Sequence, residues 1–139
     1  MSGRSHAPLI RLARFKVEEL QKQMAEIERV RGSIHDQIER LDESVPDEQA
    51  VAQENREGYL AYGSYARSVI QRKEKLRASL EEVDGQADAL RARLEDAFSE
   101  LKKFELLEER RLAQVEQSVR SAEQAEMDEI AGRMRRVAH

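Results

Sequence analysis

Apolar residues recur along the first third of the chain at alternating spacings of three and four. Ten of the eleven positions in this stripe hold apolar side chains, and the full set is Ile10, Ala13, Val17, Leu20, Met24, Ile27, Arg31, Ile34, Ile38, Leu41 and Val45. Such a repeat is typical of one helix of a coiled coil. We expect this helix over about residues 7–44, because Pro46 disfavours helical geometry at the residue before it.

A second stripe with the same spacing occupies the middle of the chain. Twelve of its thirteen positions are apolar, with Lys73 the exception: Tyr62, Ala66, Val69, Lys73, Leu76, Leu80, Val83, Ala87, Leu90, Leu94, Ala97, Leu101 and Phe104. No proline follows residue 46, so this helix is predicted over about residues 62–137, with a bend over about 45–61. The fold class is all-α: a single coiled-coil unit over 1–139, with two long helices in an antiparallel hairpin and the second helix longer than the first.

The position of the bend predicts which residues face each other. A bend near residue 52 makes the numbers of facing residues add up to roughly 104, which places Ile10 near Leu94. The start of the first helix would then lie opposite about residue 95, and the rest of the second helix would have no partner within the chain. A long single helix is marginal in water unless its apolar face is covered. We therefore expect the following residues to contact another protein chain: Phe104, Leu107, Leu112, Val115 and Val119.

Three charged residues interrupt the stripes. Arg31 and Lys73 stand within them, and Glu108 stands where the repeat predicts an apolar side chain. The stems of Arg31 and Lys73 can pack while their charges extend to solvent. Alternatively, polar stripe residues can fix the register of a coiled coil. Both interpretations are open from the residues alone.

Composition supports helices and limits the function classes. The chain has 139 residues, of which 37% are charged, with two prolines, six glycines and a formal net charge of −4. The charges of both signs are interleaved, which does not predict a nucleic-acid-binding protein. The absence of cysteine fits a cytoplasmic location. The chain has no apolar run of the roughly 20 residues needed to span a bilayer, and its start does not match a secretory signal peptide.

The chemistry of a catalytic site is not predicted. His6, His35 and His139 are far apart, and no phosphate-binding loop, zinc spacing or nucleophile motif occurs. A two-helix rod offers no enclosed pocket, so we expect a non-enzymatic protein without a cofactor. Basic residues gather at both ends of the chain, and they suit solubility or contact with an acidic partner or anionic lipid: Arg4, Arg11, Arg14, Lys16, Arg133, Arg135 and Arg136.

Three stretches together carry a resemblance to a known family. They read "LIRLARFKVEE" at 9–19, "AYGSYARSVIQRKEKL" at 61–76, and "AFSELKKFELLEERR" with "AEQAEMDEIA" at 97–111 and 122–131. In this order and spacing they resemble the bacterial flagellar export protein FliJ, particularly its alphaproteobacterial versions. The resemblance covers almost the whole chain. It implies a two-helix antiparallel coiled coil similar to the stalk subunit of rotary ATPases.

The resemblance also implies a place of action and partners. Family members act in the cytoplasm at the flagellar type III secretion apparatus, where they insert the coiled-coil end that carries the termini into the ring of the export ATPase. The basic residues Arg11, Arg14, Arg133, Arg135 and Arg136 are therefore candidate ATPase contacts, together with the apolar set from Phe104 to Val119. Further implied partners are the cytoplasmic part of the membrane export gate and export chaperones.

A gate-contacting surface is implied early in the second helix. The family places apolar or small residues there at spacings i, i+4, i+7 and i+11, and the matching positions are Tyr65, Val69, Arg72 and Leu76. Arg72 departs from this pattern, and Val69 and Leu76 also belong to the second stripe, where hairpin packing competes for them.

Two alternatives from other classes stay open. One is a structural coiled-coil scaffold that homodimerises along its length and has no role in secretion. The other is a helical protein that binds membrane surfaces through its basic ends.

Overall fold

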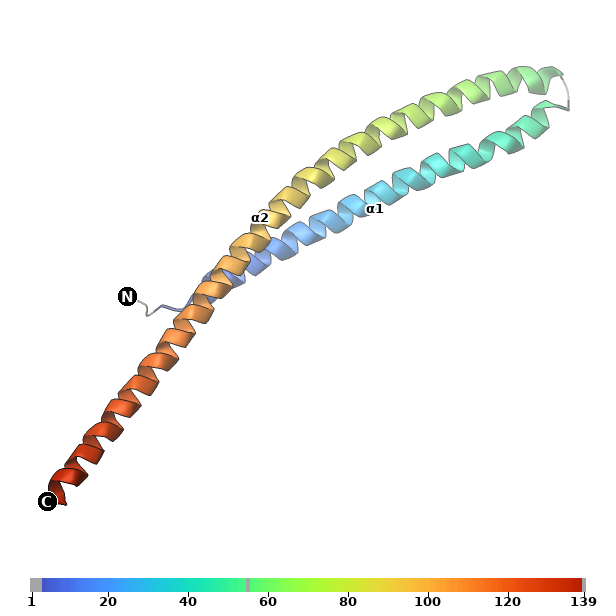
Figure 1. Ribbon diagram of the computed structural model, residues 1–139. Helices are drawn as coiled ribbons and strands as arrows, with labels where there is room; N and C mark the ends of the chain where they lie inside the picture. Colours follow the sequence, from blue (N-terminus) through green and yellow to red (C-terminus); the bar gives the residue numbers. More distant parts are fainter. Residues whose placement is uncertain (1–3, 55, 139) are drawn as a thin grey trace. The chain divides into compact units, whose positions relative to one another are not determined.

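The computed structural model describes residues 4–54 and 56–138, and two helices account for nearly all of them (Figure 1). Helix α1 spans Ala7–Ala52 and helix α2 spans Arg56–Val137. No strand occurs in the described ranges. The all-helical class and the longer second helix are confirmed. The chain divides into two compact units: a hairpin unit, Glu18–Glu95, and a terminal unit, Met1–Val17 with Asp96–His139.

In the hairpin unit the two predicted stripes form the core. The two helices run antiparallel and side by side from the turn that follows α1 (Figure 1). Every stripe residue in this unit is buried or half-buried. The most buried are Leu20 and Ile34 from α1 with Val69, Ala87 and Leu90 from α2. Burial of one stripe from each helix is the packing that a three-four repeat predicts.

Two ion pairs between the helices show the register of the hairpin unit. An Arg31 guanidinium nitrogen lies 2.8 Å from a carboxylate oxygen of Asp84. Lys73 pairs with Asp42. The residue numbers of each pair add up to 115, so the predicted value of roughly 104 is wrong. The stripe positions themselves then face each other one by one at numbers that add up to 114, one less than for the ion pairs. Leu20 is level with Leu94, and Val45 is level with Val69. The side chains of Arg31 and Lys73 are 22% and 21% exposed, and their charges meet partners across the interface.

The register differs because α1 does not end where the sequence suggested. It continues through Pro46 to Ala52, and α2 already begins at Arg56, so the expected bend over 45–61 is helical at both ends. A proline inside a helix removes one hydrogen bond and costs about 3 kcal/mol. Val45 is half-buried in the stripe, and its packing opposes that cost. Gly58, which lies within the expected bend, belongs to the first turn of α2.

In the terminal unit the start of α1 packs on α2. Ala13, Val17 and Ala97 are buried. The backbone N–H of His6 donates to a carboxylate oxygen of Glu108 at 2.7 Å, and these two residue numbers add up to 114. The start of α1 therefore lies opposite residues 104–108. The expectation that α2 is unpartnered from about residue 95 is wrong, and the uncovered part begins after Arg111, since residues 112–130 are all exposed.

Candidate partner-binding surfaces

The last part of α2 presents apolar residues to solvent. Leu112, Val115 and Val119 are 53%, 46% and 52% exposed, and Met127 and Ile130 are also exposed. We call these five residues the free stripe. The helix extends here without a second helix beside it (Figure 1). Ion pairs four residues apart, Arg120 with Glu116 and Arg133 with Glu129, support the helix on its polar side. Large apolar side chains exposed together on one face of a helix mark an interaction surface.

Phe104 and Leu107 do not belong to this uncovered surface. Both are half-buried in the terminal unit, where the register places Phe104 level with Ile10 and Leu107 level with Ala7. The bend predicted from the sequence lies too early in the chain, and both residues were therefore expected beyond the start of the first helix. Their apolar surface is therefore already partly covered by the start of α1.

The start of α1 carries a second exposed apolar set that the sequence analysis missed. Leu9, Leu12 and Phe15 are 43%, 53% and 58% exposed and lie three residues apart. Arg11 and Arg14 are exposed between them, and neither has an ion-pair partner among the described residues. The signal was present in the sequence, because these three residues are apolar and lie off the stripe. The surface combines apolar contact area with positive charge.

The arginines near the end of α2 lie in its last turns. Arg133, Arg135 and Arg136 are all exposed. Arg133 pairs with Glu129 at 2.9 Å, and the Arg136 Nε donates to the Gly132 carbonyl at 3.3 Å. Cations at this end of a helix are favourable because the helix dipole is negative there.

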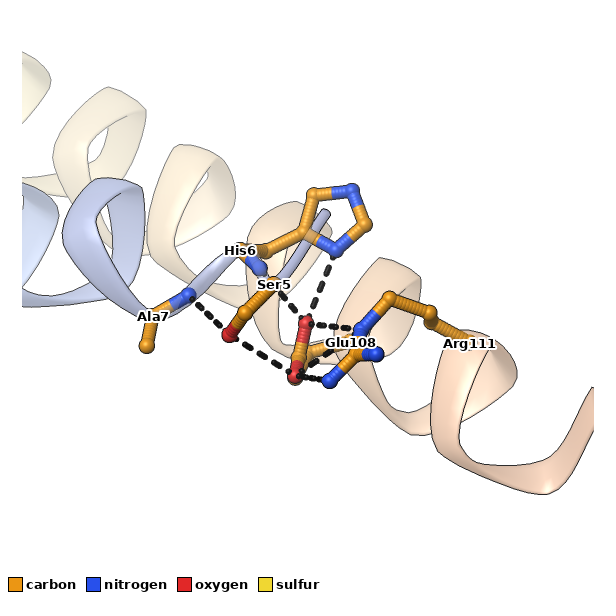
Figure 2. A network of polar contacts seen from close by, with 5 residues as sticks. All are labelled: Ser5, His6, Ala7, Glu108 and Arg111. Atoms are coloured by element: carbon orange, nitrogen blue, oxygen red, sulfur yellow. Dashed lines mark hydrogen bonds and ion pairs between the residues drawn. The ribbon is translucent and has the colours of Figure 1, made fainter. Parts of the chain in front are cut away.

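Glu108 organises a network of polar contacts where α1 begins (Figure 2). Its carboxylate accepts hydrogen bonds from the His6 backbone N–H at 2.7 Å and from the Ser5 hydroxyl at 3.2 Å. The His6 Nδ1 lies 2.9 Å from the same carboxylate. The Arg111 guanidinium donates from one turn further along α2, at 2.7 Å for its closest nitrogen. The Ser5 hydroxyl in turn accepts from the backbone N–H of Ala7 at 3.1 Å.

This network adds a negative charge to the start of α1, beside the local contact of the Ser5 hydroxyl with the Ala7 N–H. The His6 carbonyl accepts the first helical hydrogen bond, from Ile10 at 2.9 Å, and the first turn of α1 contains no acidic residue. The carboxylate of Glu108 therefore provides the negative charge that stabilises a helix N-terminus. The Arg111 guanidinium, followed by the His6 backbone N–H, holds the pKa of Glu108 well below its usual range. In the sequence, Glu108 was visible as a charged residue at an apolar position.

Three of the four residues of the expected gate-contacting surface come together in the hairpin unit. Tyr65, Arg72 and Leu76 line an open groove of about 490 Å³. Residues of α1 form its other side: Gln37, Arg40, Leu41 and Ser44. The hydroxyl groups of Tyr65 and Ser44 share a hydrogen bond. Val69 is only 3% exposed, so it packs in the core and does not join the groove.

These features define the class of protein: a two-helix antiparallel coiled coil with exposed apolar and basic surfaces near its terminal residues. Among the described residues, no cluster of acidic, His or Cys side chains suited to a metal ion occurs. No helix in those ranges is long and apolar enough to cross a membrane.

Comparison with known proteins identifies the family. Residues 5–138 match the family model of the flagellar FliJ protein, and the chain belongs to this family. No curated protein and no solved structure matches the chain. The resemblance seen in the sequence is confirmed at the level of the family, and the alphaproteobacterial subtype stays a prediction. The protein is thus a structural component associated with flagellar protein export.

Proposed function

We propose that this protein acts at the cytoplasmic face of the inner membrane, at the flagellar base, where it promotes assembly of the export ATPase ring and its coupling to the export gate. The terminal unit enters the ring, and the hairpin unit contacts the cytoplasmic part of the gate. The observation that carries the proposal is the free stripe, a row of exposed apolar residues on a single helix that ends in arginines. A ring that encloses this helix would remove the apolar surface from water.

The contact with the ATPase uses both surfaces of the terminal unit. Leu112, Val115 and Val119 provide apolar anchors on α2. Arg11 and Arg14 provide positive charge on α1, with Arg133, Arg135 and Arg136 at the end of α2. Large buried anchors typically dominate the affinity of an interface, and a few of them account for 2 kcal/mol or more each. The charges mainly raise the rate of association with an acidic surface.

Replacement of the three anchors tests the proposal. The variant L112A/V115A/V119A should lose association with the purified export ATPase in a pulldown and should impair motility in cells. A matched variant, Q117A/S121A/Q124A, changes three exposed polar residues of the same helix segment and should bind normally. Circular dichroism should show equal helix content for both. Full binding by the apolar triple variant would contradict the proposed ATPase contact.

The groove of the hairpin unit supports the gate contact. Arg72 is exposed at its edge, and Leu76 and Tyr65 are half-buried in it. The substitution Arg72→Glu should weaken binding to the cytoplasmic part of the gate without changing the melting temperature. Arg77→Glu, an exposed reversal outside the groove, is the control. Equal binding by both variants would remove the groove from the interface.

Two measurements separate this function from its rivals. A homodimerising scaffold predicts twice the chain mass in light scattering of the purified protein. A membrane-surface binder predicts strong co-sedimentation with anionic vesicles at physiological salt. We expect weak co-sedimentation, because the basic ends lack the aromatic anchors typical of interfacial helices apart from Phe15.

Export chaperones belong to the proposed partners, and the same pulldown assays test them.

A further inference from the structure

The first two turns of α1 are held to α2 by few apolar contacts. Among residues 7–12, Ala7 and Ile10 are half-buried, whereas Leu9 and Leu12 are exposed. Buried side chains of α1 begin only with Ala13 and Val17. A helix end with so little buried apolar surface opens locally at a low free-energy cost. The polar network around Glu108 therefore contributes much of what fixes this end of α1.

The surface beneath this end of α1 is apolar. Phe104 and Leu107 lie on the same face of α2 as Glu108, because spacings of three and four residues return to one side of a helix. Both are half-buried, as is Arg111, whereas every residue from 112 to 130 is exposed. The change from half-buried to exposed occurs where α1 begins. Figure 2 shows the start of α1 beside α2 at Glu108.

We propose that residues 5–12 form a cover over Phe104 and Leu107, and that Glu108 is the latch that holds this cover closed. When the cover opens, Phe104 and Leu107 join Leu112 and Val115 in one apolar surface that is about two turns longer than the free stripe alone. The cover thus regulates how much apolar surface the terminal unit offers. The identity of the partner rests on the proposed function, but the latch is a property of the free protein.

The chemistry of the latch specifies what opens it. An open cover leaves the Glu108 carboxylate with Arg111 and without the donors from Ser5 and His6. A partner that opens the cover must therefore combine an apolar groove for Phe104 and Leu107 with a hydrogen-bond donor for Glu108. A basic side chain or a helix N-terminus beside an apolar groove meets both requirements. Protonation of Glu108 is a poor trigger near neutral pH, because its pKa lies well below the usual range.

Thiol labelling of the isolated full-length protein tests the cover. The chain contains no cysteine, so a single cysteine at position 104 reports exposure of that site alone. F104C should react with N-ethylmaleimide about tenfold more slowly than V115C, with each rate normalised to the same variant unfolded in urea. Adding Glu108→Gln should raise the F104C rate several-fold and leave the V115C rate unchanged. Equal reactivity of F104C and V115C without Glu108→Gln, together with unprotected amides at 9–12 in the natural protein, would show that no cover exists.

A second route to the open state keeps Glu108 in place. The variant S5A/H6A removes the two side chains of the cover that contact the carboxylate and leaves Arg111 in place, and it should also accelerate labelling of F104C. Hydrogen exchange of amides 9–12 should rise in S5A/H6A and in E108Q, while exchange in the hairpin unit should stay constant. If F104C stays equally protected in both variants, Glu108 is not a latch.

Binding assays keep the latch and the proposed function distinct. An open cover should increase the affinity of S5A/H6A, which keeps the Glu108 carboxylate, for the export ATPase if that ring covers the apolar surface. Accelerated labelling without any ATPase binding would confirm the latch and reject the ATPase as partner. Normal ATPase binding, with a labelling rate of F104C that does not change in either variant, would support the ATPase as partner and reject the latch.

Discussion

A pair of engineered cysteines measures the register of the hairpin unit directly. The ion pairs Arg31–Asp84 and Asp42–Lys73 place Leu20 level with Leu94, whereas the bend suggested by Pro46 places Leu20 level with residue 84. The two positions are ten residues apart on α2, which corresponds to about 15 Å at 1.5 Å per residue. A disulfide joins Cα atoms that are about 4.4–6.8 Å apart. A single crosslinking experiment therefore distinguishes the two registers.

The assay uses L20C/L94C, with L20C/D84C and L20C alone as controls. Because the natural chain has no cysteine, every disulfide formed under mild oxidation comes from the introduced residues. L20C/L94C should form an intrachain disulfide, seen as a mobility change on a non-reducing gel that dithiothreitol reverses. L20C/D84C should stay unbridged within the chain. Intrachain bridging of L20C/D84C but not L20C/L94C would refute the register, and efficient dimer formation by L20C alone would favour a parallel homodimer.

Three further predictions concern local stability. Gly63→Ala should raise the free energy of unfolding by about 0.5–1 kcal/mol in a urea titration. Gly63 lies inside α2, and a Cβ added there meets no neighbouring atom within 4 Å. A destabilised variant would argue that this turn of α2 is not helical. Glu108→Gln should lower the melting temperature at pH 7, and the difference from the natural protein should shrink as the pH falls below about 4.5. The reason is that a carboxylate with a lowered pKa stabilises the folded protein above the pKa of the unfolded state, and protonation removes that contribution. A difference in melting temperature that is constant down to pH 2 would contradict the assigned contacts. F104A/L107A should increase hydrogen exchange at the start of α1 about tenfold, while V115A should leave it unchanged. Equal exchange in the two variants would mean that α1 does not pack on the face of α2 that carries Phe104 and Leu107.

The early bend suggested by Pro46 led to a register that aligns only every second stripe position. Numbers that add up to 104 pair Ile10 with Leu94 but Leu20 with Asp84, whereas numbers that add up to 114 pair every position of the first stripe with one of the second. A distinguishing signal existed in the charges. In the first register Arg31 would lie level with Lys73, and two cations would repel each other. In the observed register each of them meets an acidic residue of the opposite helix.

Local pattern alone determined the class of fold and the buried face of each helix. Every residue of both predicted stripes is buried or half-buried, because burial of one face follows from spacing within a single helix. Tertiary structure decided what depends on contacts between segments far apart in the chain. Helix α1 continues past Pro46 because the packing of Val45 opposes the helix-breaking tendency of the proline. Tertiary structure also brought Glu108 to the start of α1 and so half-buried Phe104, while Leu112 stayed exposed. Both residues were expected to contact a partner, and the point where the other helix begins determines which of them is covered.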